Sequence, residues 1–169
     1  MSSTEIMLDR LPANNRIEEA MMLAYRWAQL SPDPSNQNGA VLISCDRVIK
    51  CGFNGFTENF KPESEHLERP RKYTFIVHAE QRAVAGVDAR GRTLVCPWAA
   101  CTKCAQCIIE SGVSMVITDS RRMATTPDRW QQEIADANLM FAAAGVEVTE
   151  RSFSSFGIEI NVNGESWIA

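Results

Sequence analysis

Apolar residues recur at helical spacing in NRIEEAMMLAYRWAQL, residues 15–30, the first clearly patterned segment of the chain. This periodicity predicts an amphipathic helix with one apolar face, formed by Ile17, Ala20, Met21, Ala24, Trp27 and Ala28. Two prolines and a turn-prone Asn-Gly pair end the helix within 31–39. The next two segments, 40–45 and 47–54, are rich in β-forming residues and almost contiguous, which predicts a hairpin of two strands.

Short apolar runs alternate with helical patterns through the rest of the chain. The runs predict strands at 93–96, 114–119 and 146–150, and a weaker strand at 157–162. Helices are expected over 78–85, 101–112 and 126–145, and the last two end at Gly112 and Gly145. A hairpin followed by alternating strands and helices predicts an α/β fold, with helices on both faces of a mixed sheet.

Composition narrows the class of protein. A chain of 169 residues fits one domain, and its net charge of −4 disfavours a nucleic-acid polymer as partner, because a polymer's phosphates favour a broad basic face. The sequence shows no apolar run long enough to cross a membrane and no signal-peptide core, so we expect a cytoplasmic protein with reduced thiols. Four of the six cysteines are expected in the core, namely Cys45, Cys51, Cys96 and Cys107.

Three residues with metal-binding side chains stand at predicted helix starts. Cys101 and Cys104 lie one helical turn apart, so both sulfurs share a face, and the helix start favours their thiolate form. His78 begins another helix. If the preceding strands are neighbours in the sheet, the helix starts face each other and offer zinc three ligands with one position left for water. Glu80 is then placed to take a proton from that water and pass it to a leaving nitrogen.

Other interpretations of these residues remain open at this point. His78 can be a core histidine, with the cysteines as buried thiols. Cys107 extends the cysteines to C-x₂-C-x₂-C, as in iron–sulfur proteins, but residues 111 and 112 are serine and glycine where that run needs cysteine and proline. Cys107 as a fourth ligand would instead make the zinc purely structural.

The order H-x-E before C-x₂-C matches the signature of zinc deaminases of nucleobases. Over residues 15–149 the chain resembles the zinc-dependent cytidine and deoxycytidylate deaminases, and most of all the deoxycytidylate (dCMP) branch. The resemblance is carried by SPDPSNQNGAVLI, CGFNGF, ERPRKYTFIVHAEQRAV, TLVCPWAACTKCAQCIIESGV and ANLMFAAAGVEV. It implies a three-layer α/β/α cytidine-deaminase-like fold with about five strands. It also implies a single deaminase domain over 1–169, of which it leaves the tail, 151–169, uncovered.

The resemblance also implies a role for particular residues. His78, Cys101 and Cys104 would hold Zn²⁺, and Glu80 would be the proton shuttle. The backbone N–H of Ala79 would bind the pyrimidine carbonyl. Asn54 would donate or accept a hydrogen bond at the sugar, with a simple turn residue as the alternative.

Two departures from the family pattern bear on the substrate. The stretch before Cys101 contains Trp98 at the probable pocket mouth, where it is expected either to stack on the base or to pack in the core. Some dCMP deaminases carry a phosphate-binding tyrosine where this chain has SRRM. Arg121 or Arg122 is expected to take the phosphate instead, since guanidinium groups suit phosphate well.

The function that these residues favour is hydrolytic deamination of a cytosine nucleotide, with dCMP converted to dUMP and ammonia. The alternatives are another cytosine nucleotide or nucleoside, a base in tRNA or single-stranded nucleic acid, or a non-catalytic protein with structural zinc. The resemblance further implies a homo-oligomer. The long polar segment 55–71 lies where dCTP and dTTP act as effectors on some dCMP deaminases, and loops of this length are usually functional or disordered.

Overall fold

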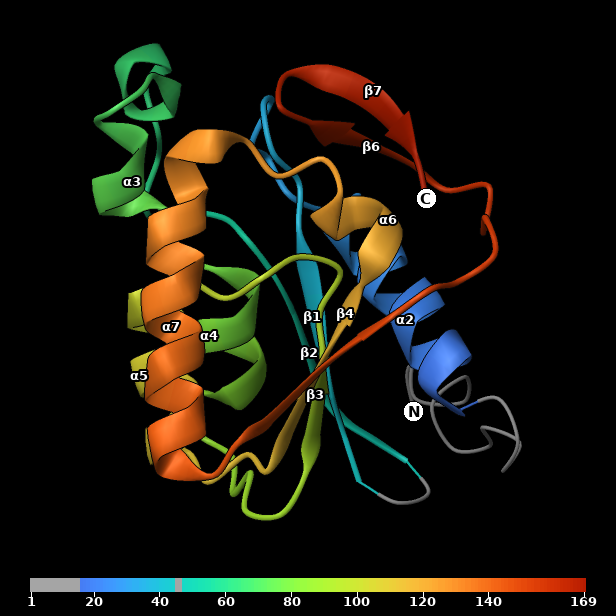
Figure 1. Ribbon diagram of the computed structural model, residues 1–169. Helices are drawn as coiled ribbons and strands as arrows, with labels where there is room; N and C mark the ends of the chain where they lie inside the picture. The colour runs from blue at the N-terminus through green and yellow to red at the C-terminus, as the bar shows by residue number, and fades with distance from the viewer. Residues whose placement is uncertain (1–15, 45–46) are drawn as a thin grey trace, which may run out of the picture.

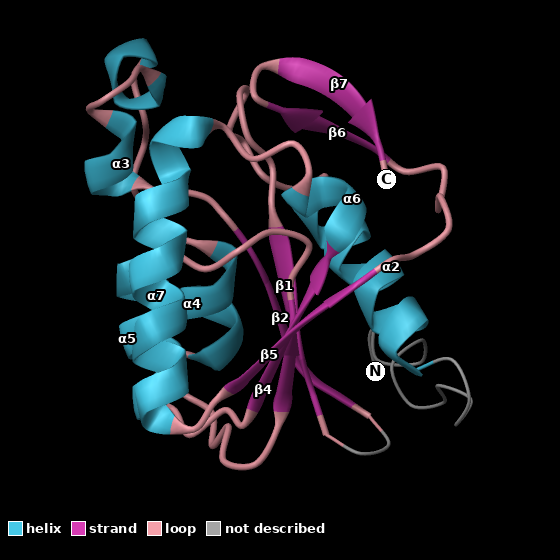
Figure 2. Ribbon diagram, viewed as in Figure 1, coloured by secondary structure: helices cyan, strands magenta, loops and turns pink. Residues whose placement is uncertain are grey.

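The computed structural model describes residues 16–44 and 47–169. A mixed five-stranded sheet with the order β2-β1-β3-β4-β5 lies at its centre (Figures 1 and 2). β1 pairs antiparallel with both β2 and β3, whereas β3, β4 and β5 run parallel to one another. The strands are β1 (Gly39–Ile43), β2 (Val48–Phe53), β3 (Thr93–Val95), β4 (Met115–Asp119) and β5 (Glu147–Arg151).

Helices cover both faces of this sheet (Figure 1). α4 (Ala79–Val84), α5 (Thr102–Glu110) and α7 (Gln131–Ala144) pack on one face, and α2 (Arg16–Ala28) packs on the other. The hairpin of β6 (Glu159–Val162) and β7 (Glu165–Ile168) continues the α2 layer. The predicted three-layer α/β/α fold with a mixed sheet is therefore confirmed. Within the two described ranges, none of the helices is long and apolar enough to cross a membrane.

Each face of the sheet carries its own apolar core, because successive strand residues point to opposite faces. Leu42, Leu94 and Val116 pack against α4, α5 and α7, whereas their neighbours Val41, Val95 and Ile117 pack against α2 and the tail. All residues of β1 are buried, as expected for a strand that is covered on both faces.

Two strand glycines allow helices to approach the sheet closely. A Cβ atom on Gly39 would lie 1.9 Å from the carbonyl oxygen of Ala24 in α2, and one on Gly52 would lie 2.5 Å from that of Ala79 in α4. Both contacts are far below van der Waals distance, so a side chain at either position would displace the helix. Gly52 thereby determines how close the start of α4 lies to the sheet.

The structure contains several short elements that the sequence pattern did not predict. They are η1 (Ser64–Leu67), α3 (Lys72–Phe75), α6 (Ser120–Met123), η2 (Asp128–Trp130) and β7. The helix expected over 126–145 is divided into η2 and α7. Elements of three or four residues are too short to show a periodicity, which is why hydrophobic patterning misses them. The expectation for Cys45 lies outside the described residues.

Candidate metal centre and substrate pocket

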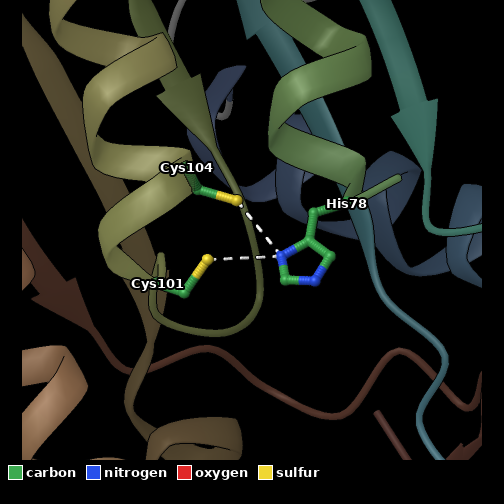
Figure 3. A group of neighbouring side chains, drawn as sticks. All are labelled: His78, Cys101 and Cys104. Carbon is green, nitrogen blue, oxygen red and sulfur yellow. Dashed lines mark hydrogen bonds between the residues drawn. The ribbon is translucent and has the colours of Figure 1, made fainter. Parts of the chain in front are cut away.

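Two helix starts bring the three predicted zinc ligands together. His78 is the N-cap residue of α4, Cys101 is the N-cap residue of α5, and Cys104 lies in the first turn of α5. In Figure 3 the two sulfurs and the imidazole point toward one another from these helices. Nδ1 of His78 lies 3.2 Å from Sγ of Cys104 and 3.4 Å from Sγ of Cys101. One nitrogen and two sulfurs are thus presented to a common point, and the ligand atoms all lie within 4.8 Å of one another.

Hydrogen bonds within this cluster shift the pKa values of Cys101, Cys104 and His78 away from their usual values. The hydrogen bond from Cys104 lowers the pKa of Cys101 to about 4 and raises that of Cys104 far above its usual value. Burial opposes the positive charge of His78. The hydrogen bond to Cys101 and the charges of Glu80 and Cys101 outweigh that effect and raise the pKa of His78 to about 9. The cluster therefore holds an imidazolium beside a thiolate at neutral pH, with a proton left on Cys104.

Glu80 lies in the same pocket as this cluster and is only 3% exposed. Burial raises its pKa to about 7, against the opposing effect of His78. A carboxyl group with such a pKa takes up and gives back a proton near neutral pH with little free-energy cost in either direction. Its burial and its pKa suit a proton carrier, and the role of Glu80 in proton transfer stays a prediction.

Cys107 takes no part in the cluster. Its sulfur instead accepts a long contact of 3.8 Å from Nε2 of Gln81, and the residue packs against the core under α5. Within the part of the chain that the structure describes, the donor set consists of His78, Cys101 and Cys104 alone. Catalytic zinc sites characteristically use three protein ligands, whereas structural sites use four, so this donor set fits zinc of the catalytic kind.

Three aromatic side chains from different elements form one wall of the pocket. Trp98, Trp130 and Tyr73 all line it, and each neighbouring pair meets edge to face. The ring centroids of Trp98 and Trp130 are 6.1 Å apart, and the indole N–H of Trp98 donates to Oγ1 of Thr126 at 2.9 Å. Trp98 was expected either to stack on the base at the pocket mouth or to pack in the core, and its place in the pocket lining agrees with the first of these. The sequence did not identify Trp130 and Tyr73 as pocket residues, because nothing in the residues around them indicates a shared site.

Charged side chains also line the pocket, and two of them adjoin the aromatic wall: Nζ of Lys72 lies 5.7 Å from the ring centroid of Tyr73, and the guanidinium carbon of Arg129 lies 5.8 Å from that of Trp130. Lys72 forms an ion pair of 2.8 Å with Asp33, and both side chains are 3% exposed. Lys72 also donates to the hydroxyl of Ser35, which Arg69 approaches at 3.5 Å. Of these residues Asp33, Arg69 and Lys72 line the pocket, together with Arg129 from η2. Of the three cations in the lining, Arg69 and Arg129 are exposed at the pocket rim, whereas Lys72 is buried and paired with Asp33.

The tip of the C-terminal hairpin also reaches the pocket. Asn163 lines it and donates to the carbonyl oxygen of Thr125 at 3.0 Å, while the N–H of Gly164 donates to the carbonyl oxygen of Ser35 at 2.8 Å. Positive φ angles of 55° and 89° at these two residues form the tight turn that an Asn-Gly pair favours. An Asn-Gly pair signals a turn in the sequence, but the contacts of this turn with Thr125 and with the far more distant Ser35 were not visible there.

Asn54 lines the pocket, but its amide is engaged with the chain itself. Oδ1 accepts from the backbone N–H of Asn38 at 2.7 Å, and Nδ2 donates to the carbonyl oxygen of Asn36 at 2.8 Å. It therefore orders the loop that precedes β1. Ala79 is fully buried as the first residue of α4, where a backbone N–H has no acceptor within the helix.

Neither Arg121 nor Arg122 lines the pocket, although one of them was expected to bind the phosphate. Arg121 donates to the carbonyl oxygen of Ile168 at 3.0 Å and lies over the ring of Trp167, so it belongs to the contact with the tail. Arg122 is 1% exposed and lies beneath Trp98. The cations that do line the pocket are Arg69, Lys72 and Arg129. One of the two arginines was expected at the phosphate, because a sequence of four residues does not show in which direction each side chain of the short α6 points.

A buried glutamate beside one histidine and two cysteines at the starts of two helices on an α/β/α scaffold is typical of zinc-dependent hydrolytic deaminases. The family model of the cytidine and deoxycytidylate deaminase zinc-binding region matches residues 14–120, more than half of the chain, so the chain belongs to this family.

Individual relatives agree with this membership. An uncharacterized deaminase from Aliivibrio fischeri is 36% identical over 124 residues, which cover 70% of this chain and 82% of that protein. The deoxycytidylate deaminase of Mus musculus is 30% identical over 147 residues, covering 81% and 79%. The crystal structure of the dCMP deaminase from cyanophage S-TIM5 in complex with dCMP and dUMP has the same fold. Its TM-score is 0.61 at 24% identity, and the match covers 80% of this chain and 97% of that one.

Proposed function

We propose that the chain is a zinc-dependent deaminase of cytosine nucleotides that converts dCMP to dUMP and ammonia. The main observation in support of this proposal is that His78, Cys101 and the buried Glu80 line the same pocket as the aromatic wall. The family membership and the similarity to deoxycytidylate deaminases support the same substrate class.

The donor set would hold one zinc ion through Nδ1 of His78 and the sulfurs of Cys101 and Cys104. Zinc bound by three protein ligands supplies a Lewis acid that activates water at neutral pH. Two thiolates neutralise much of the charge of the ion, so we expect a nearby base to be needed as well. Glu80 is the buried carboxyl group in reach of the cluster, and its pKa of about 7 suits that task.

Glu80 then moves protons at both stages of the reaction. It accepts a proton from the attacking water as the new C–O bond forms at C4 of the cytosine. It passes this proton to N3 of the ring, then takes the proton of the hydroxyl now on C4 and delivers it to the amino group as the C–N bond breaks, so that ammonia leaves and the carbonyl of uracil remains. One side chain serves both steps because the two protons are exchanged at neighbouring positions on the same carbon.

The pocket walls orient the base and the sugar phosphate. We expect Trp98 to face the pyrimidine ring and the N–H of Ala79 to bind its carbonyl oxygen. The phosphate would lie beside the cations that line the pocket, which are Arg69, Lys72 and Arg129. These cations replace Arg121 and Arg122 in our proposal. A homo-oligomer and an effector such as dCTP or dTTP, acting near 55–71, stay predictions that rest on the family resemblance.

The proposal is tested by ammonia release from cytidine and deoxycytidine carrying zero, one or three phosphates. Turnover that is fastest with dCMP supports it. Equal turnover of the free nucleosides would show that the rim cations do not select a phosphate. Turnover limited to tRNA or single-stranded DNA, with steep salt dependence, would assign the chain to the polymer deaminases instead.

A further inference from the structure

Asn38 carries a buried hydrogen-bond acceptor that has no partner within the described ranges 16–44 and 47–169. The residue is 7% exposed and lines the pocket beside Glu80 and Asn54. A buried acceptor without a donor costs roughly 1–3 kcal/mol, so such groups are rare unless a ligand completes them. The unpartnered atom is Oδ1 of the Asn38 amide.

The rest of Asn38 is held in place, so this acceptor cannot turn toward another protein donor at little cost. Nδ2 donates to Sγ of the buried Cys96 at 3.3 Å. The backbone N–H donates to Oδ1 of Asn54 at 2.7 Å. Asn54 is itself tied to the carbonyl oxygen of Asn36. The amide of Asn38 is thus fixed by its other end and by its backbone, and Asn54 acts to position it.

The location of Asn38 indicates which part of a nucleotide it meets. The loop 31–38 joins Asp33, which pairs with the pocket-lining Lys72, to Asn38, whose amide shares the neighbour Cys96 with Glu80. Asn38 lies at the inner end of this loop. A base at the metal cluster and a phosphate at the rim place the sugar between them, alongside Asn38. A 2′-deoxynucleotide carries one sugar hydroxyl, at the 3′ position, and that hydroxyl is a donor.

We propose that Oδ1 of Asn38 accepts a hydrogen bond from the 3′-hydroxyl of the bound deoxynucleotide. This inference rests on the proposed function, because it assumes that a cytosine nucleotide is the substrate. It makes Asn38 the residue that recognises the sugar, and it gives Asn54 the task of positioning Asn38. A site built around a buried acceptor rejects a ligand that lacks the matching donor, because the acceptor then stays unpaired.

The test compares dCMP with 2′,3′-dideoxycytidine monophosphate, which lacks the 3′-hydroxyl. For the wild type we expect kcat/KM to favour dCMP by about 10- to 100-fold, as for a hydrogen bond to a buried group. Asn38→Leu keeps the approximate side-chain volume and removes the acceptor. This variant is expected to bring the ratio close to one, mostly through loss of activity on dCMP.

Stability distinguishes substrate recognition from a structural role. Asn38→Leu removes an unpaired acceptor, which favours the folded state, and the hydrogen bond from Nδ2 to Cys96, which opposes that gain, so its unfolding midpoint in urea should change little. Asn36→Leu is the matched control in the same loop, because Oδ1 of Asn36 accepts from the buried Arg122 at 2.8 Å. It should lower the midpoint and leave the ratio between the two nucleotides as in the wild type.

Each result decides the matter. An active wild type with the same substrate ratio in Asn38→Leu would overturn the inference and leave the proposed function standing, and a bound water would then be the partner of Asn38. A wild type that deaminates neither nucleotide would overturn the proposed function and the inference together. A clear fall in the urea midpoint of Asn38→Leu with an unchanged ratio would show that Asn38 is structural only.

Discussion

The guanidinium group of Arg122 lies over the indole ring of Trp98, with its central carbon 4.9 Å from the ring centroid. Burial lowers the pKa of Arg122 to about 10, so the group stays charged at neutral pH. It donates to Oδ1 of Asn36 at 2.8 Å and to Oγ1 of Thr125 at 2.6 Å. Trp98 is therefore supported by a fixed cation on one face, while its N–H is held by Thr126. A tryptophan anchored in this way is a rigid surface for a flat ligand.

Replacement of Arg122 by lysine should weaken this support, because lysine keeps the charge but loses the planar group and its paired hydrogen bonds. We expect KM for dCMP to rise roughly 3- to 10-fold and the free energy of unfolding to fall by about 1–3 kcal/mol. Steady-state kinetics and urea denaturation measure the two effects. Arg121→Lys is the control, since Arg121 makes the same kind of contact with Trp167 in the tail. An equal rise in KM for that control would return Arg121 to the substrate site.

The hydroxyl of Tyr25 donates to Oδ2 of Asp119 at 2.7 Å in the buried layer between α2 and the sheet. Burial and this hydrogen bond hold the pKa of Tyr25 well above its usual value. Tyr25→Phe should lower the free energy of unfolding by about 1.5–3 kcal/mol, the usual range for a hydrogen bond to a charged group. Tyr73→Phe, at a residue that is 38% exposed, should change it by less than about 0.5 kcal/mol. Urea denaturation of both variants decides whether the buried hydroxyl contributes as stated.

Zinc binding should release protons and strengthen as the pH rises. The ligands must bind as neutral imidazole and thiolates, but the pKa of His78 is raised to about 9 and that of Cys104 is raised further. Each therefore has to lose a proton at pH 7, whereas Cys101, with its pKa lowered to about 4, does not. We expect about two protons to be released per zinc ion near pH 7. Calorimetric titration of the chelator-treated protein in buffers of different ionisation enthalpy measures this number, and no proton release would contradict the ligand assignment.

The rim cations should select for the phosphate. Arg69→Gln and Arg129→Gln are each expected to raise KM for dCMP about 10-fold, the order of a hydrogen bond to a charged group. Activity on deoxycytidine, which has no phosphate, should stay within about 2-fold of the wild type in both variants. Arg90→Gln is the control, because Arg90 pairs with Asp88 at an exposed position outside the pocket lining. A similar loss on both substrates would mean that these arginines do not contact the phosphate.

The metal site was accessible to sequence reasoning because its chemistry is local. The spacing of Cys101 and Cys104 by one helical turn, and of His78 and Glu80 at one helix start, determines where these side chains point. The two helix starts meet because α4 and α5 pack side by side on one face of the sheet. The strands before them, β2 and β3, are not the neighbours that the sequence argument assumed, since β1 lies between them. The strands and the long helices were predicted for the same reason, since each shows several periods of its apolar pattern.

The substrate end of the pocket was not accessible in the same way. The Asp33–Lys72 pair and the contact of Asn163 with Thr125 join distant parts of the chain, and neither partner is unusual in its own neighbourhood. Arg121 and Arg122 are adjacent in sequence yet contact the tail and Trp98 respectively. Such orientations depend on how short elements pack, which a pattern of a few residues does not specify.

Glu80→Gln provides the most direct measurement on the central claim, that one buried carboxyl group carries protons beside a bound zinc ion. The substitution keeps the shape of the side chain and removes its capacity to exchange protons. We predict that the purified variant holds as much zinc per chain as the wild type, and that its kcat for ammonia release from dCMP falls by roughly 10²- to 10⁴-fold. Full zinc content with turnover near that of the wild type would contradict the account.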